Sequence, residues 1–288
     1  MSDVMSEEPT PGVLKWLQSQ RAAGFDSLAL YQALRESGWA HEVACRMVGL
    51  QPAQVSEPAA GSHAPHSTAD RPVPWPPGAG ERALLDGGDR PVQALAVVRE
   101  PNIIVLADLL SAEECDALVE AARPRLSRSL TVSVKTGGEE ENIDRTSQGM
   151  FFERGENECI ARIEARLAHL LDWPVDNGEG LQILRYGPGA EYKPHYDYFD
   201  PLEPGTSSIL QRGGQRVATV VMYLNEPEAG GATVFPEVQL ECLPRKGHAV
   251  FFNYSRPHPS SRSLHAGAPV VRGEKWIATK WLREARFD

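Results

Sequence analysis

Short apolar runs separated by turn residues make up the second half of the chain, and this pattern restricts the fold more than any other feature. The clearest runs are Leu181–Tyr186, Val217–Leu224, Ala232–Phe235, Ala249–Asn253 and Trp276–Leu282. They are rich in β-branched and aromatic residues, as strands are. Turn residues between successive runs favour a sandwich or jelly roll over a parallel sheet.

Strands and helices are also predicted before this region. Ala94–Val98 and Ile103–Leu106 have the composition of strands. Ser111 opens a capping box, which predicts the start of an amphipathic helix, and Glu158–Leu171 has the pattern of a second helix. Residues 93–288 are therefore predicted to form one α+β domain with a jelly-roll core and flanking helices.

The first 92 residues have a different character. Residues 1–50 carry an interrupted helical pattern and predict a small helical segment. It is too short for a substantial core of its own, so we expect it to pack on another surface or to mediate dimerisation. Residues 51–92 are rich in proline among Ala, Gly, Ser and His, and predict a linker.

Composition and charge argue against several classes of protein. The 288 residues carry a net charge of -10 without a dense Lys/Arg cluster, which argues against nucleic acid as a partner. No apolar run approaches the roughly 20 residues that span a bilayer, and the acidic N-terminus lacks the features of a signal peptide. We therefore expect a cytoplasmic protein without a membrane partner. The scattered cysteines predict free thiols rather than a disulfide framework; they are Cys45, Cys115, Cys159 and Cys242.

The segment His195-Tyr-Asp is the strongest candidate for a metal site. In an extended strand, residues two apart point to the same face, so His195 and Asp197 can converge on one ion. His265, after a predicted strand, is the best candidate for a third ligand. Two imidazoles and one carboxylate leave open positions that suit Fe(II) binding a chelating cosubstrate and oxygen, whereas zinc favours three histidines or cysteines.

Three other histidines compete for the third position. His169 falls in a predicted helix, where a surface or capping role is expected, and His248 precedes a buried strand. His258 lies between two prolines in a predicted loop. Their settings favour His265 as the ligand.

Lys275 is a candidate anchor for the cosubstrate. Strand alternation puts it on one face with Ile277, Thr279 and Trp281, which are mostly apolar, while Lys280 points the other way. A lysine on an inward face is costly unless an anion pairs with it, and the distal carboxylate of 2-oxoglutarate is such an anion. The alternative is an edge lysine whose stem reaches solvent.

Four motifs in order resemble the collagen-type prolyl 4-hydroxylase family of Fe(II)/2-oxoglutarate-dependent dioxygenases. They are Asp144-Arg-Thr-Ser, Arg185-Tyr-Gly-Pro-Gly-Ala-Glu-Tyr-Lys-Pro-His-Tyr-Asp, Thr219-Val-Val-Met-Tyr-Leu-Asn with Gly230-Gly-Ala-Thr-Val-Phe-Pro, and Leu264-His-Ala-Gly-Ala-Pro-Val-Val-Arg-Gly-Glu-Lys-Trp. The resemblance covers about residues 93–285. His248 departs from the family, which often has a small acidic residue there.

The resemblance implies a double-stranded β-helix core that uses Fe(II), 2-oxoglutarate, oxygen and L-ascorbate. Carried over by position, it implies that the iron ligands are His195, Asp197 and His265 and that Lys275 binds 2-oxoglutarate. It also implies that the cosubstrate pocket is lined by Tyr186, Thr219 and Trp281.

The implied reaction is hydroxylation of prolyl residues at C4 in a peptide or protein, with release of succinate and carbon dioxide. Arg145 and Arg216 are candidate peptide contacts, and the polar segments Val134–Gln148 and Asp200–Arg216 are candidate lids. The proline-rich tract is itself a sequence that such an enzyme could recognise. Two alternatives remain open: the same chemistry on a free amino acid or small metabolite, and a non-catalytic cupin-like metal sensor.

Overall fold

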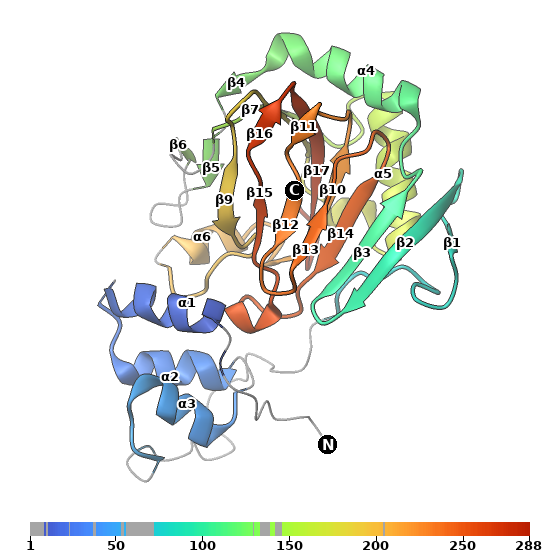
Figure 1. The fold of residues 1–288 in the computed structure, drawn as a ribbon. Helices are drawn as coiled ribbons and strands as arrows, with labels where there is room; N and C mark the ends of the chain where they lie inside the picture. Colours follow the sequence, from blue (N-terminus) through green and yellow to red (C-terminus); the bar gives the residue numbers. More distant parts are fainter. Residues whose placement is uncertain are drawn as a thin grey trace. The chain divides into compact units, whose positions relative to one another are not determined.

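The computed structural model describes residue 9, residue 55 and most of the chain from 11 onward. The longer described ranges are 11–22, 24–36, 39–52, 72–128, 130–132, 139–141, 146–203 and 205–288. The chain divides into two compact units (Figure 1). One is Met1–Arg71 with His258–Arg262, and the other is Pro72–Pro257 with Ser263–Asp288.

The first unit contains three short helices, as the sequence predicts. They are α1 (Pro11–Ala22), α2 (Ser27–Glu36) and α3 (His41–Val48). Leu17, Leu30 and Trp39 are among the buried residues of their common apolar cluster. The helices therefore share a small core, and the later segment His258–Arg262 belongs to the same unit, with the His258 ring 4.9 Å from that of Trp16.

The second unit combines helices with many short strands. Its α-helices are α4 (Ala112–Ala122), α5 (Glu158–Leu171) and α6 (Thr206–Leu210). Its strands are β1 (Leu84–Asp86), β2 (Pro91–Arg99), β3 (Asn102–Ala107), β4 (Ser127–Arg128), β5 (Leu130–Val132), β6 (Glu139–Glu141), β7 (Gln148–Phe152), β8 (Leu181–Tyr186), β9 (Tyr192–His195), β10 (Arg216–Tyr223), β11 (Ala229–Gly230), β12 (Thr233–Phe235), β13 (Leu240–Cys242), β14 (Ala249–Asn253), β15 (His265–Gly267), β16 (Val270–Arg272) and β17 (Lys275–Arg283).

Two sheets form the body of this unit. The larger has nine strands in the order β1-β2-β3-β14-β10-β17-β8-β7-β4, and the smaller has four in the order β13-β12-β15-β9. All the strand pairs in them are antiparallel. In Figure 1 the smaller sheet lies in front of β10, β14 and β17. This is the predicted double-stranded β-helix with flanking helices.

The strands of the large sheet send alternate side chains into two separate cores. On one face, Ala278 of β17 packs with Leu118 of α4 and Ile163 of α5. On the other face, Ile277 of the same strand joins Phe235 of the small sheet. β17 is buried on both faces. Because side chains alternate along a strand, its odd-numbered residues point between the two sheets.

Local signals set the ends of the two long helices. The Ser111 hydroxyl accepts a hydrogen bond from the Glu114 amide, and the Glu114 carboxylate accepts one from the Ser111 amide, which completes the predicted capping box. Asn157 caps α5 in a similar way by accepting from the amide of Ile160. The residue ranges of α5, β8 and β14 are those that the sequence predicts.

The folded unit begins earlier than the sequence suggests. A linker was predicted over 51–92 and the domain from 93, but the second unit starts at Pro72, and β1 lies before residue 93. Leu85 is buried in the core beneath the helices, and the Asn253 side chain donates a hydrogen bond to the carbonyl oxygen of Pro74 at 2.8 Å. Proline masks the strand and helix patterns, but it does not prevent the apolar residues beside it from packing.

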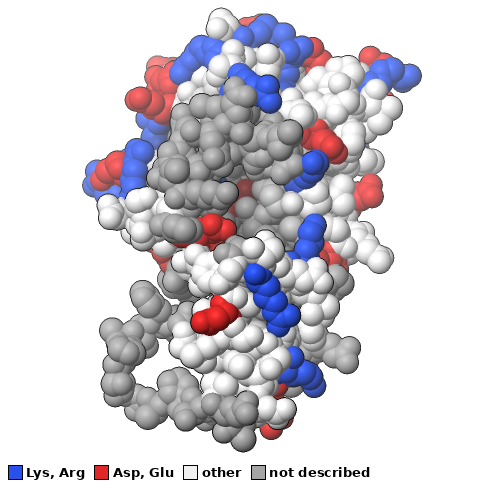
Figure 2. All heavy atoms as spheres, turned by 90° about the vertical axis from the view of Figure 1, so that its left-hand side faces the viewer, with Lys and Arg blue, Asp and Glu red and all other residues white. Residues whose placement is uncertain are grey.

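The described surface carries charges of both signs. Among the residues coloured in Figure 2, basic and acidic side chains are interspersed. The exposed ion pairs Arg272–Glu228 and Lys246–Asp116 show the same mixing. In the part of the chain that the structure describes, no helix is long and apolar enough to cross a membrane.

Candidate metal centre

The small sheet brings the two candidate histidine ligands together. β9 ends at His195 and β15 begins at His265, and these two residues face each other in the antiparallel register of the two strands. Asp197 follows β9 in a bend rather than inside the strand. The two imidazoles therefore converge through strand pairing, and the carboxylate reaches them because the chain turns immediately after His195.

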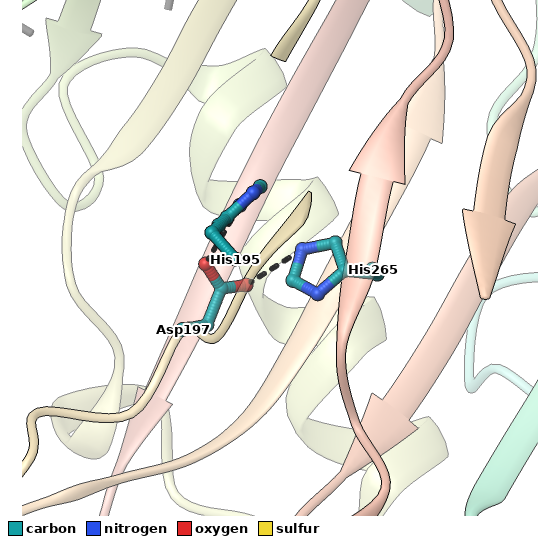
Figure 3. A group of neighbouring side chains, drawn as sticks. All are labelled: His195, Asp197 and His265. Atoms are coloured by element: carbon teal, nitrogen blue, oxygen red, sulfur yellow. Dashed lines mark ion pairs between the residues drawn. The ribbon is translucent and has the colours of Figure 1, made fainter. Parts of the chain in front are cut away.

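The three side chains form a compact group of possible metal ligands. Asp197 Oδ1 lies 3.6 Å from His195 Nε2, and Asp197 Oδ2 lies 3.5 Å from His265 Nε2 (Figure 3). All the potential ligand atoms lie within 4.8 Å of one another. Among the described residues, this is the one group of three or more His, Cys, Asp or Glu side chains close enough to share an ion.

Backbone carbonyl groups orient both imidazoles. His195 Nδ1 lies 2.8 Å from the carbonyl oxygen of Lys193, and His265 Nδ1 lies 3.0 Å from that of Ser263. A carbonyl oxygen can only accept, so each Nδ1 carries the hydrogen in the neutral ring. Each Nε2 is then left with a lone pair, which is the form of histidine that binds a metal.

The carboxylate of Asp197 is buried yet held in its charged form. Burial would raise the pKa of Asp197, but the two imidazoles, the Arg216 guanidinium and the Thr219 hydroxyl outweigh it and lower the pKa to about 2. The side chains of Asp197 and His265 are 7% and 6% exposed, whereas that of His195 is 19% exposed. The group therefore presents one carboxylate and two imidazoles, a ligand set that suits Fe(II).

The competing histidines lie elsewhere. His169 Nε2 lies 3.0 Å from Asp86 at the surface, where it forms an ion pair when protonated. His248 lies between β13 and β14, where burial lowers its pKa. His258 Nδ1 lies 3.0 Å from the Ser260 hydroxyl, in the short segment assigned to the first unit. None of the three belongs to the ligand group.

A cavity between the two sheets contains the ligand group and Lys275. Its lining residues are Leu184, Tyr186, Tyr192, His195, Asp197, Val221, Thr233, His265, Ala266, Gly267, Lys275, Ile277, Thr279 and Trp281. The odd-numbered residues of β17 from 275 to 281 are all in this wall, as strand alternation predicts. Lys280, on the opposite face, pairs with Glu164 of α5.

Lys275 is a buried cation with no anionic partner among the described residues. The residue is 2% exposed, and burial lowers its pKa from 10.5 to about 8. Within the part of the chain that the structure describes, its ammonium has neither a hydrogen-bond acceptor nor a carboxylate; it lies 5.6 Å and 5.8 Å from the ring centroids of Tyr186 and Tyr223. Gly231 leaves space for its stem, because a Cβ there would lie 3.1 Å from Lys275 Cδ.

The three further residues assigned to the cosubstrate pocket fall in different places. Tyr186 and Trp281 line the cavity, but Thr219 does not. The Thr219 hydroxyl instead donates to Asp197 Oδ2 at 2.7 Å. Sequence reasoning did not single out Thr233 as a site residue, although it stands in the quoted Gly-Gly-Ala-Thr motif and lines the cavity.

Of the two candidate peptide contacts, the structure describes Arg216, and this residue is buried. Arg216 was proposed to meet the peptide, but only 11% of its side chain is exposed, and its Nε donates to Glu179 Oε1 at 2.7 Å. Its guanidinium also lies 3.9 Å from the ring centroid of Trp281. Arg216 is therefore part of the buried core. Arg145 and most of the predicted lid Val134–Gln148 lie outside the described residues.

Arg216→Gln should destabilise the fold rather than weaken peptide binding selectively. The substitution leaves the buried Glu179 carboxylate with Arg283 as its remaining charged partner. Breaking a buried ion pair from one side costs about 3–5 kcal/mol, so we expect the free energy of unfolding in urea to fall by that amount. A variant of unchanged stability with a raised KM for peptide would contradict this and restore the contact role.

Comparisons with known proteins agree with the site. The family model of the 2OG-Fe(II) oxygenase superfamily matches residues 181–283. Prolyl 4-hydroxylase 5 of Arabidopsis thaliana is 40% identical over 221 residues, covering 69% of this chain and 74% of that protein. Prolyl 4-hydroxylase 1 of the same plant is 44% identical over 205 residues, covering 64% and 69%.

A solved structure is similar as well. The viral collagen prolyl hydroxylase from Paramecium bursaria Chlorella virus-1, in its 2OG complex, is 32% identical, with a TM-score of 0.50. The match covers 63% of this chain and 95% of that chain. The unpaired Lys275 ammonium and the three ligand side chains line one cavity, which fits Fe(II) and the dicarboxylate 2-oxoglutarate. The chain belongs to the prolyl 4-hydroxylase family of Fe(II)- and 2-oxoglutarate-dependent dioxygenases.

Proposed function

We propose that this enzyme hydroxylates prolyl residues at C4 in a peptide or protein and converts 2-oxoglutarate to succinate and carbon dioxide. The observation that carries the proposal is the shared cavity. It contains His195, Asp197 and His265 together with Lys275, a buried cation that has no anionic partner in the part of the chain that the structure describes. A protein that only bound or sensed a metal would gain nothing from the cost of burying that ammonium.

The residues of the chain have separable tasks in this reaction. Bound Fe(II) and 2-oxoglutarate together supply the oxidation of an unactivated C–H bond by oxygen. The backbone carbonyls of Lys193 and Ser263 hold both imidazoles with their Nε2 atoms free for the metal. Lys275 supplies a charge-assisted hydrogen bond to the distal carboxylate of the cosubstrate.

The cavity wall limits water and orients what enters. Leu184, Val221 and Ile277 form its apolar part. Apolar walls exclude water, which strengthens the electrostatic attraction between Lys275 and a carboxylate. Tyr192 stacks on the His195 ring with centroids 3.6 Å apart, so the most exposed ligand is covered on one face.

The proposal also names a substrate and a reductant. The named relatives are prolyl 4-hydroxylases, which supports a proline-containing peptide or protein as the substrate. A net charge of -10 is compatible with a basic or neutral peptide. L-Ascorbate is proposed as the reductant, in keeping with the family resemblance.

Succinate release with a proline-rich peptide tests the function. We expect peptide-dependent turnover of 2-oxoglutarate in the presence of Fe(II) and ascorbate, with one added oxygen on proline by mass spectrometry. His195→Ala should lose this turnover, because it removes one of the three ligands. Turnover that is stimulated by a free amino acid and not by peptides would keep the oxygenase chemistry but reject the peptide substrate.

A further inference from the structure

The geometry points to Thr219 and Tyr254 as positioning residues that hold the Asp197 carboxylate for the metal through a directed chain of hydrogen bonds. The inference rests on the proposed metal centre and adds two residues to it. Neither side chain lines the cavity. Both therefore act through Asp197 rather than by touching cosubstrate or substrate.

The two hydrogen bonds that link Tyr254, Thr219 and Asp197 are short and buried. Thr219 Oγ1 donates to Asp197 Oδ2 at 2.7 Å, and Tyr254 OH lies 3.0 Å from the same Thr219 Oγ1. Thr219 is 0% exposed, Tyr254 3% and Asp197 7%. Hydrogen bonds in such a setting are electrostatically stronger than in water, and successive bonds polarise one another.

The number of hydroxyl hydrogens determines which residue donates in each of these two hydrogen bonds. A threonine hydroxyl has one hydrogen, and a charged carboxylate can only accept, so that hydrogen goes to Asp197. Thr219 Oγ1 can then interact with Tyr254 only as an acceptor. The order is therefore Tyr254 O–H to Thr219 O–H to Asp197 Oδ2, and each donor has a single possible acceptor in the chain.

Neighbouring strands fix both residues. Thr219 lies in the middle of the large sheet, opposite Phe252 of β14 on one side and Trp281 of β17 on the other. Tyr254 directly follows β14, and its amide donates to the carbonyl oxygen of Val217 at 2.9 Å. Asp197 lies in a bend after an edge strand, so its carboxylate takes its orientation from the more rigid sheet through Thr219.

These hydrogen bonds fix the orientation in which the Asp197 carboxylate meets the metal. Asp197 Oδ2 is held by Thr219, and Oδ1 is the oxygen nearer to His195 Nε2. An occupied Oδ2 disfavours binding of both oxygens to the same ion. Partners of this kind, which orient a ligand without touching the metal, are commonly worth about 10–100-fold in metal affinity.

The test measures Co(II) binding to the full chain without 2-oxoglutarate or peptide, by chelator competition and by the visible absorption of bound Co(II). Thr219→Val removes the central hydroxyl with little change in shape, Tyr254→Phe removes the terminal donor, and Thr219→Ser keeps a hydroxyl. Tyr198→Phe is the matched control, since in the described residues its buried hydroxyl has no hydrogen-bond partner although its ring lies 6.1 Å from that of Tyr254.

We expect Thr219→Val to weaken Co(II) binding about 10–100-fold and to shift the absorption bands. Tyr254→Phe should weaken binding about 3–10-fold, because it acts only through Thr219. The double variant should bind like Thr219→Val alone, whereas two independent structural effects would multiply. Thr219→Ser and Tyr198→Phe should stay within about twofold of the wild type.

Several outcomes would overturn the inference. Equal affinity and equal spectra in wild type, Thr219→Val and Tyr254→Phe would do so, as would multiplicative effects in the double variant. If Thr219→Val does not fold, Tyr254→Phe against Tyr198→Phe still decides, because only the former is expected to weaken binding. Absence of Co(II) binding in the wild type would reject the proposed metal centre and the chain of hydrogen bonds with it.

Discussion

Lys275→Met should make the protein more stable and weaken its binding of 2-oxoglutarate. The ammonium of Lys275 is buried, and its pKa falls from 10.5 to about 8. Since one pKa unit corresponds to 1.36 kcal/mol, the wild type carries a penalty of about 3 kcal/mol for keeping this charge. An apolar side chain of similar length removes the penalty, and it also removes the anchor for the distal carboxylate. We expect turnover to fall at least about 100-fold, as for a buried ion pair broken from one side.

The gain in stability should depend on pH with a defined sign. Below pH 8 the lysine is charged in both the folded and the unfolded wild type, so the full penalty applies. Between about 8 and 10.5 the unfolded chain binds more protons than the folded one, so the stability of the wild type rises with pH. The advantage of Lys275→Met, measured by urea unfolding without metal, should therefore be largest below pH 8 and shrink towards pH 10.5.

Lys280→Met is the matched comparison on the same strand. Lys280 is as buried as Lys275, but it pairs with Glu164. Its removal leaves that carboxylate buried without its cation, and we expect a loss of about 3–5 kcal/mol. If Lys275→Met and Lys280→Met both stabilised the protein, or both destabilised it, the missing partner of Lys275 would not explain the free-energy cost of burying it.

His265→Ala should abolish metal binding and turnover, whereas His248→Ala should leave both close to wild type. His265 is one of the three ligand residues, while His248 lies outside the group. Residues that merely orient ligands account for about 10–100-fold in affinity, so loss of a ligand should exceed about 100-fold. Equilibrium dialysis with Fe(II) under argon and succinate release measure the two effects.

The opposite pattern would reassign the third ligand. Full metal binding in His265→Ala combined with loss in His248→Ala would show that His248 reaches the ion in solution. Both substitutions change only a side chain and keep the backbone N–H and C=O groups at these positions. Circular dichroism of each variant separates loss of a ligand from loss of the fold.

Local patterns in the sequence were enough to predict much of the scaffold. α5 and β8 have the predicted ends because a cap, a turn or a change of periodicity marks them within a few residues. The face of Lys275 followed from alternation along β17, which depends only on neighbouring positions. The beginning of the folded unit at Pro72 was missed, because Leu85 and the residues near it gain their burial from strands far along the chain.

Long-range pairing explains the other differences. Arg216 was predicted as a peptide contact because nothing near it in the sequence signals Glu179, which pairs with it only in the folded protein. The resemblance implied a place in the cosubstrate pocket for Thr219, but its hydroxyl donates to Asp197, and this contact depends on where the chain turns after β9. The register that sets His195 opposite His265 likewise joins segments about seventy residues apart, and no local pattern encodes it.

Because the cavity is lined by both sheets, a ligand bound in it contributes to the stability of the fold. Lys275 and Tyr186 come from the large sheet, whereas His195 and His265 come from the small one. A molecule that binds at both ends fastens the two layers together, and it stabilises the folded state by about 2.7 kcal/mol at a free concentration of 100 times its Kd. The melting temperature of the protein should therefore rise with the concentration of 2-oxoglutarate, because the ligand joins one sheet to the other.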